Sequence, residues 1–226
     1  LQKGDVQMYL EELLLAFSSK KLDAQSKIKK FVPILQSTIE NETYDFNYVL
    51  MLGRTLVETH PEDEMINYIY ADLLNSNKDF DLAIVHYKEV LKINKNQQDA
   101  WIEMLFLHLR MKHYDELIID SEEALEFFPT NSTIYYLNAL AYYNSKDFLN
   151  TIESLNIGVN FIANNSSLSS EMYSLLGETY NEIEDYENSD RSFERSLEFL
   201  PNNALVLNNY AYYLSLRGEK LEKAEK

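Results

Sequence analysis

The sequence has no cysteine, so disulfide bonds, thiolate metal sites and cysteine nucleophiles are all excluded. Glycine and proline are scarce, with 5 and 4 residues in a chain of 226, and the tight turns of an all-β or α/β fold depend on these two residue types. No apolar run approaches the ~20 residues that a membrane-spanning helix needs. These absences favour a helical protein and exclude membrane insertion by this segment.

Positive charge is also in short supply. Lys and Arg number 20 against 37 Asp and Glu, which gives a formal net charge of −17. Because phosphate binding needs clustered Lys and Arg, this balance argues against nucleic acid as a partner. It argues equally against an anionic membrane surface, and the acidic excess by itself indicates little beyond solubility.

The sequence shows no residue pattern typical of an active site or a metal site. The four histidines lack the HExxH spacing of zinc enzymes, and there is no glycine-rich phosphate loop or G-x-S-x-G elbow. Acidic residues gather between Glu182 and Glu187, but a solvated turn does not hold carboxylates in the fixed, perturbed positions that catalysis needs. We therefore predict a non-enzymatic protein with no catalytic residue, no cofactor and no metal.

The chain repeats itself along its length. The segments "ALEFFP" at 124–129 and "SLEFLP" at 196–201 are the clearest copies, and units placed at 64, 98, 132, 170 and 204 are spaced 34, 34, 38 and 34 residues apart. The longer interval contains the polar run "NNSSLSS" at 164–170, which predicts a loop lengthened by four residues. Periods in this range indicate stacked copies of one supersecondary unit.

Each unit has the periodicity of two helices. In the unit at 170, one apolar stripe falls at i, i+3, i+4 and i+7: Tyr173, Leu176, Gly177 and Tyr180. A second stripe follows a polar turn, and Pro201 ends it because proline cannot continue a helix. Small residues such as Gly158 and Gly177 lie where the two helices of a pair would cross. We therefore expect antiparallel amphipathic helix pairs that pack on one another.

These residues resemble the tetratricopeptide repeat (TPR) family, which has a 34-residue period. The unit at 170 carries the family pattern best, with Tyr173, Leu176-Gly177, Tyr180, Phe193 and Pro201. The resemblance implies an all-α fold, a right-handed α-α superhelix or solenoid of about five units. It assigns 62–226 to the repeat array, with the last unit truncated. The style of the sequence also resembles bacterial members of the family.

The first 61 residues fit the pattern less well. The segment 44–61 has the character of a second helix that ends at Pro61, and 5–19 reads as a further amphipathic helix. The partner helix in 23–40 contains Pro33, which should kink or restart it. We predict that 1–61 forms a divergent N-terminal unit, because a terminal repeat meets water on one face.

In this family the first helix of each pair lines a concave groove, and the resemblance carries that lining over to this chain. The expected partner-binding groove is apolar and aromatic at its centre and acidic towards its C-terminal part. Its residues are Ile102, Phe106, Arg110, Tyr136, Leu140, Tyr143, Asn144, Ser174, Glu178, Asn181, Glu182 and Tyr212. Lysine does not occur in this lining, so the groove should not clamp the acidic C-terminal tails that chaperone-binding TPR domains hold.

These observations predict a protein–protein interaction scaffold that binds a peptide or helical segment of another protein in the groove. Two alternatives stay open: the chain is the regulatory or oligomerisation arm of a larger enzyme or signalling protein, or adjacent segments fill the groove. Self-association through the truncated C-terminal repeat is a further option. Both ends read as cuts in a longer protein, so the localisation is unknown, with a periplasmic or lipid-anchored bacterial protein favoured over a cytoplasmic one.

Overall fold

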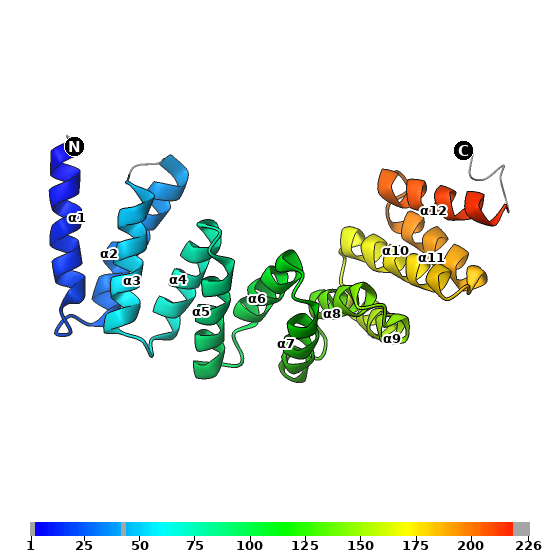
Figure 1. Ribbon diagram of the computed structural model, residues 1–226, viewed down its shortest axis with the longest axis horizontal. Helices are drawn as coiled ribbons and strands as arrows, with labels where there is room; N and C mark the ends of the chain where they lie inside the picture. The colour runs from blue at the N-terminus through cyan, green and yellow to red at the C-terminus, as the bar shows by residue number, and fades with distance from the viewer. Residues whose placement is uncertain (1–2, 42–43, 219–226) are drawn as a thin grey trace. The chain divides into compact units, whose positions relative to one another are not determined.

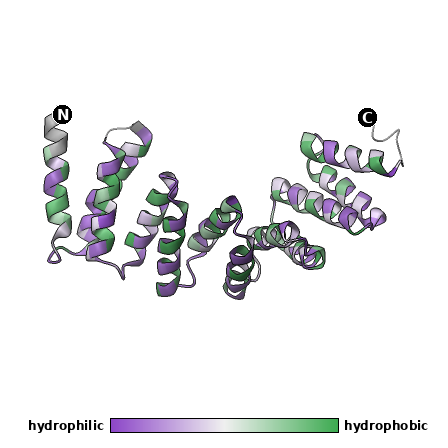
Figure 2. Cartoon of the chain, in the orientation of Figure 1, coloured by the Kyte–Doolittle hydropathy of each residue, from purple (hydrophilic) through white to green (hydrophobic). Residues whose placement is uncertain are grey.

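The computed structural model describes residues 3–41 and 44–218, and within them the chain forms α-helices, one 3-10 turn and no strand (Figure 1). Hydrophobic and hydrophilic residues alternate along the helices, as amphipathic helices require (Figure 2). The expected all-α fold of antiparallel helix pairs is confirmed. The chain divides into two compact units, Leu1–Leu107 and His108–Lys226, and the division falls within one helix.

The first unit contains three helices followed by a regular helix pair. Its helices are α1 (Lys3–Ser18), α2 (Ala24–Asn41), α3 (Phe46–Thr59), α4 (Glu64–Ser76), α5 (Phe80–Ile93) and the greater part of α6 (Gln98–Met111). Both α1 and α2 pack on α3, which in turn packs on α4, and α4 pairs with α5. Phe17, Phe31 and Leu52 are buried, so α1, α2 and α3 each contribute to the core of the N-terminal part.

One prediction for this unit is wrong in part. Helix α2 runs without interruption through Pro33, so the proline does not restart it. A proline at this position removes the backbone hydrogen bond to the carbonyl of Lys29. Both Pro33 and Lys29 are exposed, so water can satisfy that carbonyl and the helix continues.

The second unit is a series of helix pairs. After the end of α6 it contains α7 (Tyr114–Phe127), α8 (Ser132–Asn144), α9 (Phe148–Gly158), the 3-10 turn η1 (Val159–Phe161), α10 (Ser166–Glu182), α11 (Tyr186–Phe199) and α12 (Ala204–Arg217). Consecutive helices from α7 to α12 pack on one another, and α10 also contacts α8 and α12. A Cβ atom on Gly177 would lie 2.8 Å from the Phe193 ring, and one on Gly158 would lie 2.6 Å from Tyr135 Cβ. The small residues thus mark close helix crossings, as expected.

The polar run at 164–170 forms a helix start and not a longer loop, which corrects the prediction. Asn165 caps α10 by accepting a hydrogen bond from the Leu168 N–H at 3.1 Å. Ser169 donates its hydroxyl to the Asn165 carbonyl, and Ser170 is buried with its Oγ 2.9 Å from Ser196 Oγ. The preceding connection, 162–165, is as long as those at 94–97, 128–131 and 200–203. The inserted residues therefore lengthen α10, which has 17 residues.

One residue with left-handed backbone geometry lies just after the first helix of each of five successive units. These residues, with φ between 60° and 67°, lie 34, 34, 38 and 34 residues apart: Lys78, Lys112, Lys146, Glu184 and Gly218. Only the last is a glycine, although an L-residue in this region costs about 1–2 kcal/mol. The backbone geometry therefore repeats at these five positions, although the residue type at them does not.

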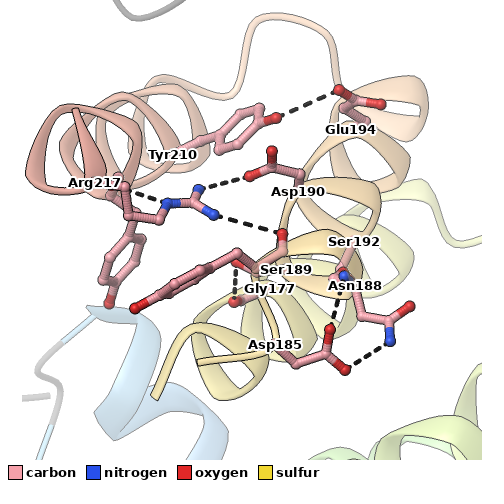
Figure 3. Close-up of polar contacts among 11 residues, drawn as sticks. Gly177, Asp185, Asn188, Ser189, Asp190, Ser192, Glu194, Tyr210 and Arg217 are labelled. Carbon is pink, nitrogen blue, oxygen red and sulfur yellow. Dashed lines mark hydrogen bonds and ion pairs between the residues drawn. The ribbon is translucent and has the colours of Figure 1, made fainter. Parts of the chain in front are cut away.

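A buried ion pair joins α11 to α12 (Figure 3). The Arg217 guanidinium lies 2.6 Å from Asp190 Oδ1, and the two side chains are 7% and 10% exposed. Arg217 also donates to the Tyr213 carbonyl and lies over the Tyr186 ring, 4.9 Å from its centroid. On the same pair of helices, the Tyr210 hydroxyl donates to Glu194. These contacts fix α12 against α11.

Replacing Lys146 by glycine should stabilise the protein by about 0.5–1 kcal/mol, because glycine adopts the left-handed conformation without steric strain. Urea unfolding followed by circular dichroism measures the change. Ser145→Gly is the matched control, because Ser145 has φ −82° and gains nothing from glycine. Equal stabilisation by both substitutions would contradict the assignment of strain to Lys146.

Replacing Arg217 by methionine should destabilise the second unit by about 3 kcal/mol, because it removes one partner of a buried ion pair. Arg191→Met is the control: Arg191 forms an ion pair with Glu187 in which the side chains are 68% and 84% exposed. Such an exposed pair contributes about 1 kcal/mol or less. Thermal unfolding of both variants compares the two, and equal losses would rule out a special role for Arg217.

Candidate functional site

The predicted groove residues of the second unit lie on the first helices of successive pairs. Tyr136, Leu140 and Tyr143 are on α8, while Glu178 and its neighbours are on α10. Because α10 packs against both α8 and α12, side chains from the three helices meet over α10. The site is therefore built on helices and not on loops.

Glu178 is the centre of this arrangement. Its Oε1 atom accepts hydrogen bonds from Asn209 Nδ2 on α12 at 3.1 Å and from Ser174 Oγ at 3.4 Å. Burial raises the pKa of the Glu178 carboxyl above its usual value, and the charge of Glu182 raises it further, while the two hydrogen bonds oppose the shift. Glu178 is thus a half-buried carboxylate whose partners are neutral donors.

Tyrosines from two helices lie near enough to this carboxylate for its charge to act on them. Burial and the charges of Glu171 and Glu178 raise the pKa of Tyr136 to about 12. Burial also raises the pKa values of Tyr143 and Tyr213, and the charges of Glu178 and Glu182 add to both shifts. We name Glu178, Glu182, Tyr136, Tyr143 and Tyr213 the Glu178 cluster.

The Glu178 cluster has no cationic partner in the part of the chain that the structure describes. Neither Glu178 nor Glu182 forms an ion pair among residues 44–218, and the same range holds no group of His, Cys, Asp and Glu side chains fit to bind a metal ion. The Tyr136 and Tyr143 rings are half-buried against an apolar core that includes Met172 and Leu175, and the Tyr213 ring packs against a second core that includes Phe193. The cluster therefore presents negative charge beside aromatic surface.

The other predicted groove residues take several positions. Tyr212 is 57% exposed and stacks edge-on with Tyr213, with ring centroids 5.6 Å apart. Ser174 is buried beneath Glu178 and is not open to a large partner. Asn144 is exposed and donates to the Leu140 carbonyl of its own helix, while Asn181 is half-buried beside the cluster.

Three predicted residues lie on α6. Arg110 is exposed near the end of this helix. Ile102 and Phe106 belong to the first unit, where Ile102 is half-buried and Phe106 is 45% exposed, so the phenylalanine is not sealed in a core. The Glu178 cluster itself is formed entirely by residues of the second unit.

Sequence reasoning missed two residues of the site, Asn209 and Tyr213. The family pattern directed attention to Tyr212 on the same helix, whereas the structure places Asn209 on the Glu178 carboxylate. A spacing of four residues, one helical turn, connects Asn209 to Tyr213. That spacing is the one signal in the sequence that could have grouped them.

Stacked helix pairs with a recurrent left-handed turn and exposed aromatic and acidic side chains define a helical-repeat protein. One tetratricopeptide repeat model matches residues 66–97 and 170–203, and a second tetratricopeptide repeat model matches 192–226. The chain therefore contains tetratricopeptide repeats over these residues. The fold is that of protein–protein interaction scaffolds, and the family is a class of non-catalytic scaffolds.

Among curated proteins, the chain is similar to BBS4, a member of the BBSome complex, from Bos taurus, with 26% identity over 169 residues. The match covers 75% of this chain and 32% of BBS4, and the mouse protein matches with 25% identity. The chain thus spans about a third of the length of the curated relatives it matches.

Among solved structures, residues 41 to the end of MamA from Desulfovibrio magneticus RS-1 align with a TM-score of 0.64 at 19% identity, covering 78% of this chain and 96% of that one. YrrB, described as a TPR protein with an unusual peptide-binding site, aligns with a TM-score of 0.57 at 18% identity, covering 76% of this chain and 86% of YrrB. Likeness at this identity shows the fold alone. No helix in residues 3–41 or 44–218 is long and apolar enough to cross a bilayer.

Replacing Glu178 by glutamine should stabilise the protein at neutral pH. A carboxyl whose pKa is raised by folding contributes stability below its unfolded pKa of about 4.5, and this contribution is lost as pH rises through the higher folded pKa. Glutamine removes the penalty and keeps an oxygen that accepts from Asn209. Urea unfolding at pH 7.5 should therefore favour the variant, and the difference should shrink towards pH 4.5. A difference that does not change over this range would contradict the burial of charge at Glu178.

Proposed function

We propose that the chain is a non-enzymatic scaffold that binds a peptide or helical segment of another protein on the face formed by α8, α10 and α12. The observation that carries this proposal is the Glu178 cluster, a half-buried carboxylate among tyrosines with no described cation beside it. A basic side chain of a partner would supply the missing charge, and the tyrosine rings would pack on its methylene stem.

The exposed surface around the cluster supports the same interpretation. Tyr212 is 57% exposed, and Glu182 is also exposed on the same side of the unit. Aromatic residues that combine a large apolar ring with a polar end are enriched at protein interfaces. The partner segment should therefore carry basic residues together with apolar anchors, and it should not be rich in acidic residues.

The comparisons lend this proposal support by analogy. YrrB is described as having a peptide-binding site, and BBS4 is described as a member of a complex. The second candidate function, a regulatory or oligomerisation arm of a larger protein, is favoured by the coverage of BBS4, because this chain corresponds to 32% of that protein. The two candidates are compatible, since an arm of this kind also acts by binding.

A synthetic probe tests the proposal directly. The probe is a fluorescein-labelled amphipathic helical peptide with leucines on one face and lysines on the other, and fluorescence anisotropy measures its binding to the whole chain. We expect Glu178→Gln combined with Glu182→Gln to raise the Kd at least tenfold. Tyr212→Ala should raise it severalfold, because this ring is open to the partner.

The control variant Glu126→Gln/Glu153→Gln removes the same charge from exposed positions on α7 and α9 of the same unit. It should leave the Kd within about twofold, because solvent and dissolved ions screen exposed charges. Equal loss of binding in the control and the cluster variant would show non-specific attraction to an acidic protein. Equal binding of a probe with glutamate in place of lysine would also overturn the proposal.

A further inference from the structure

The first unit contains a hollow that the proposed function does not use. A cavity of about 330 Å³ opens between α2, α4 and α6. Its walls are apolar on one side and acidic on the other. The lining is Leu35, Ile39, Tyr68, Asp72, Leu73, Asn75, Ser76 and Glu103. The volume is at the lower end of the range for small ligand pockets, so it suits one long side chain and not a folded element.

Two carboxylates, on different helices, line the acidic wall. Asp72 on α4 accepts a hydrogen bond from the Tyr87 hydroxyl, which holds its carboxylate in place. Glu103 comes from α6, and Asp99 lies one turn before it on the same helix. Burial raises the pKa values of both Asp72 and Glu103, and the charge of Asp99 raises both further. These acidic groups therefore repel one another across a partly desolvated space.

The structure supplies no positive charge to this wall from the described residues of the first unit. Elsewhere in the unit, ion pairs join Arg54 to Glu58 and Lys92 to Glu89 on exposed helix faces. Neither Asp72 nor Glu103 takes part in an ion pair among residues 3–41 and 44–107. The tyrosine hydroxyl on Asp72 is neutral, so it orients the carboxylate without cancelling its charge.

The opposite wall is apolar and partly open. Ile39 is 58% exposed at the cavity, Leu35 is half-buried and Leu73 is buried. The Tyr68 ring lies beside Tyr87, with ring centroids 5.9 Å apart. A long aliphatic stem can pack against such a wall while its charged end reaches the carboxylates. Aromatic rings next to the charged end add cation–π attraction.

We propose that this cavity binds the arginine side chain of a partner polypeptide, with its guanidinium on Asp72 and Glu103. Charge complementarity selects a cation, and the apolar wall selects one that ends a hydrocarbon stem. Two carboxylates from different helices suit the planar, multidentate guanidinium better than the point charge of lysine. The inference is independent of the proposed function, because all lining residues belong to the first unit.

Methyl NMR of the full chain tests the assignment, with Nα-acetyl-arginine amide as the probe. We expect saturable shifts at the methyl groups of Leu35, Ile39 and Leu73, with a Kd on the order of millimolar, as is normal for so small a ligand. Nα-acetyl-citrulline amide has nearly the same shape without the charge. It should bind at least fivefold more weakly, and equal binding would overturn the proposal.

The variant Asp72→Asn/Glu103→Gln should abolish saturation by the arginine probe, whereas Glu62→Gln/Asp81→Asn, which removes exposed charges from the same unit, should leave it intact. If the first variant unfolds, Ile39→Lys serves in its place, because Ile39 is exposed and a lysine there can reach the carboxylates. It should block the probe and raise the thermal midpoint.

Three further results would overturn the assignment. Shifts spread over every acidic surface would show non-specific attraction. Identical shifts with magnesium or calcium chloride at lower concentration would show an inorganic cation site. Persistent saturation in Asp72→Asn/Glu103→Gln would place the probe elsewhere. Glu178→Gln/Glu182→Gln should leave arginine binding unchanged, so failure of the first-unit site and failure of the proposed function are distinguishable.

Discussion

An amphipathic helix pair cannot bury its apolar face alone, and the close crossing of paired helices is the constraint on which the rest of this structure depends. At Gly177 a single Cβ atom would come within 2.8 Å of the Phe193 ring, so the two helices touch through ring and backbone. That contact fixes the orientation of α10. Glu178, the next residue, consequently points away from the Phe193 crossing towards α8 and α12.

The helices and their period were predictable from the sequence, because the packing of helix pairs requires the apolar spacing and the proline-ended segments that recur along it. The helical insertion at 164–170 was not, because asparagine and serine are common in loops and also cap helices. Asn165 caps α10, and Ser170 is buried with its hydroxyl oxygen in hydrogen-bond contact with that of Ser196. The boundary between the two units, at Leu107 and His108, could not be predicted from composition because it falls inside a helix.

The site was predictable in part, for a related reason. The family pattern assigns helix faces, so it grouped Tyr136, Tyr143 and Glu178, which also share the candidate site in the structure. It does not fix the rotation of α12 to within one residue, and neighbouring positions on a helix differ by about 100°. Asn209 and Tyr213 were missed for this reason. The two carboxylates of the first-unit cavity were missed because they come from different helices, α4 and α6. Residue spacing within a single helix cannot predict that they lie together.

Both units place partly buried carboxylates beside tyrosines and not beside lysines. A neutral donor, such as the Tyr87 hydroxyl on Asp72 or the Asn209 amide on Glu178, satisfies the hydrogen-bonding needs of a carboxylate but leaves its charge, so the desolvation penalty persists in the free protein. A cationic partner relieves that penalty on binding, and part of its affinity then comes from strain that already exists in the unbound chain. Stability and recognition are opposed at the same residues, as they commonly are at binding sites. On this view the negative charge of the chain matters for recognition mainly at these few half-buried carboxylates, where solvent screens it least.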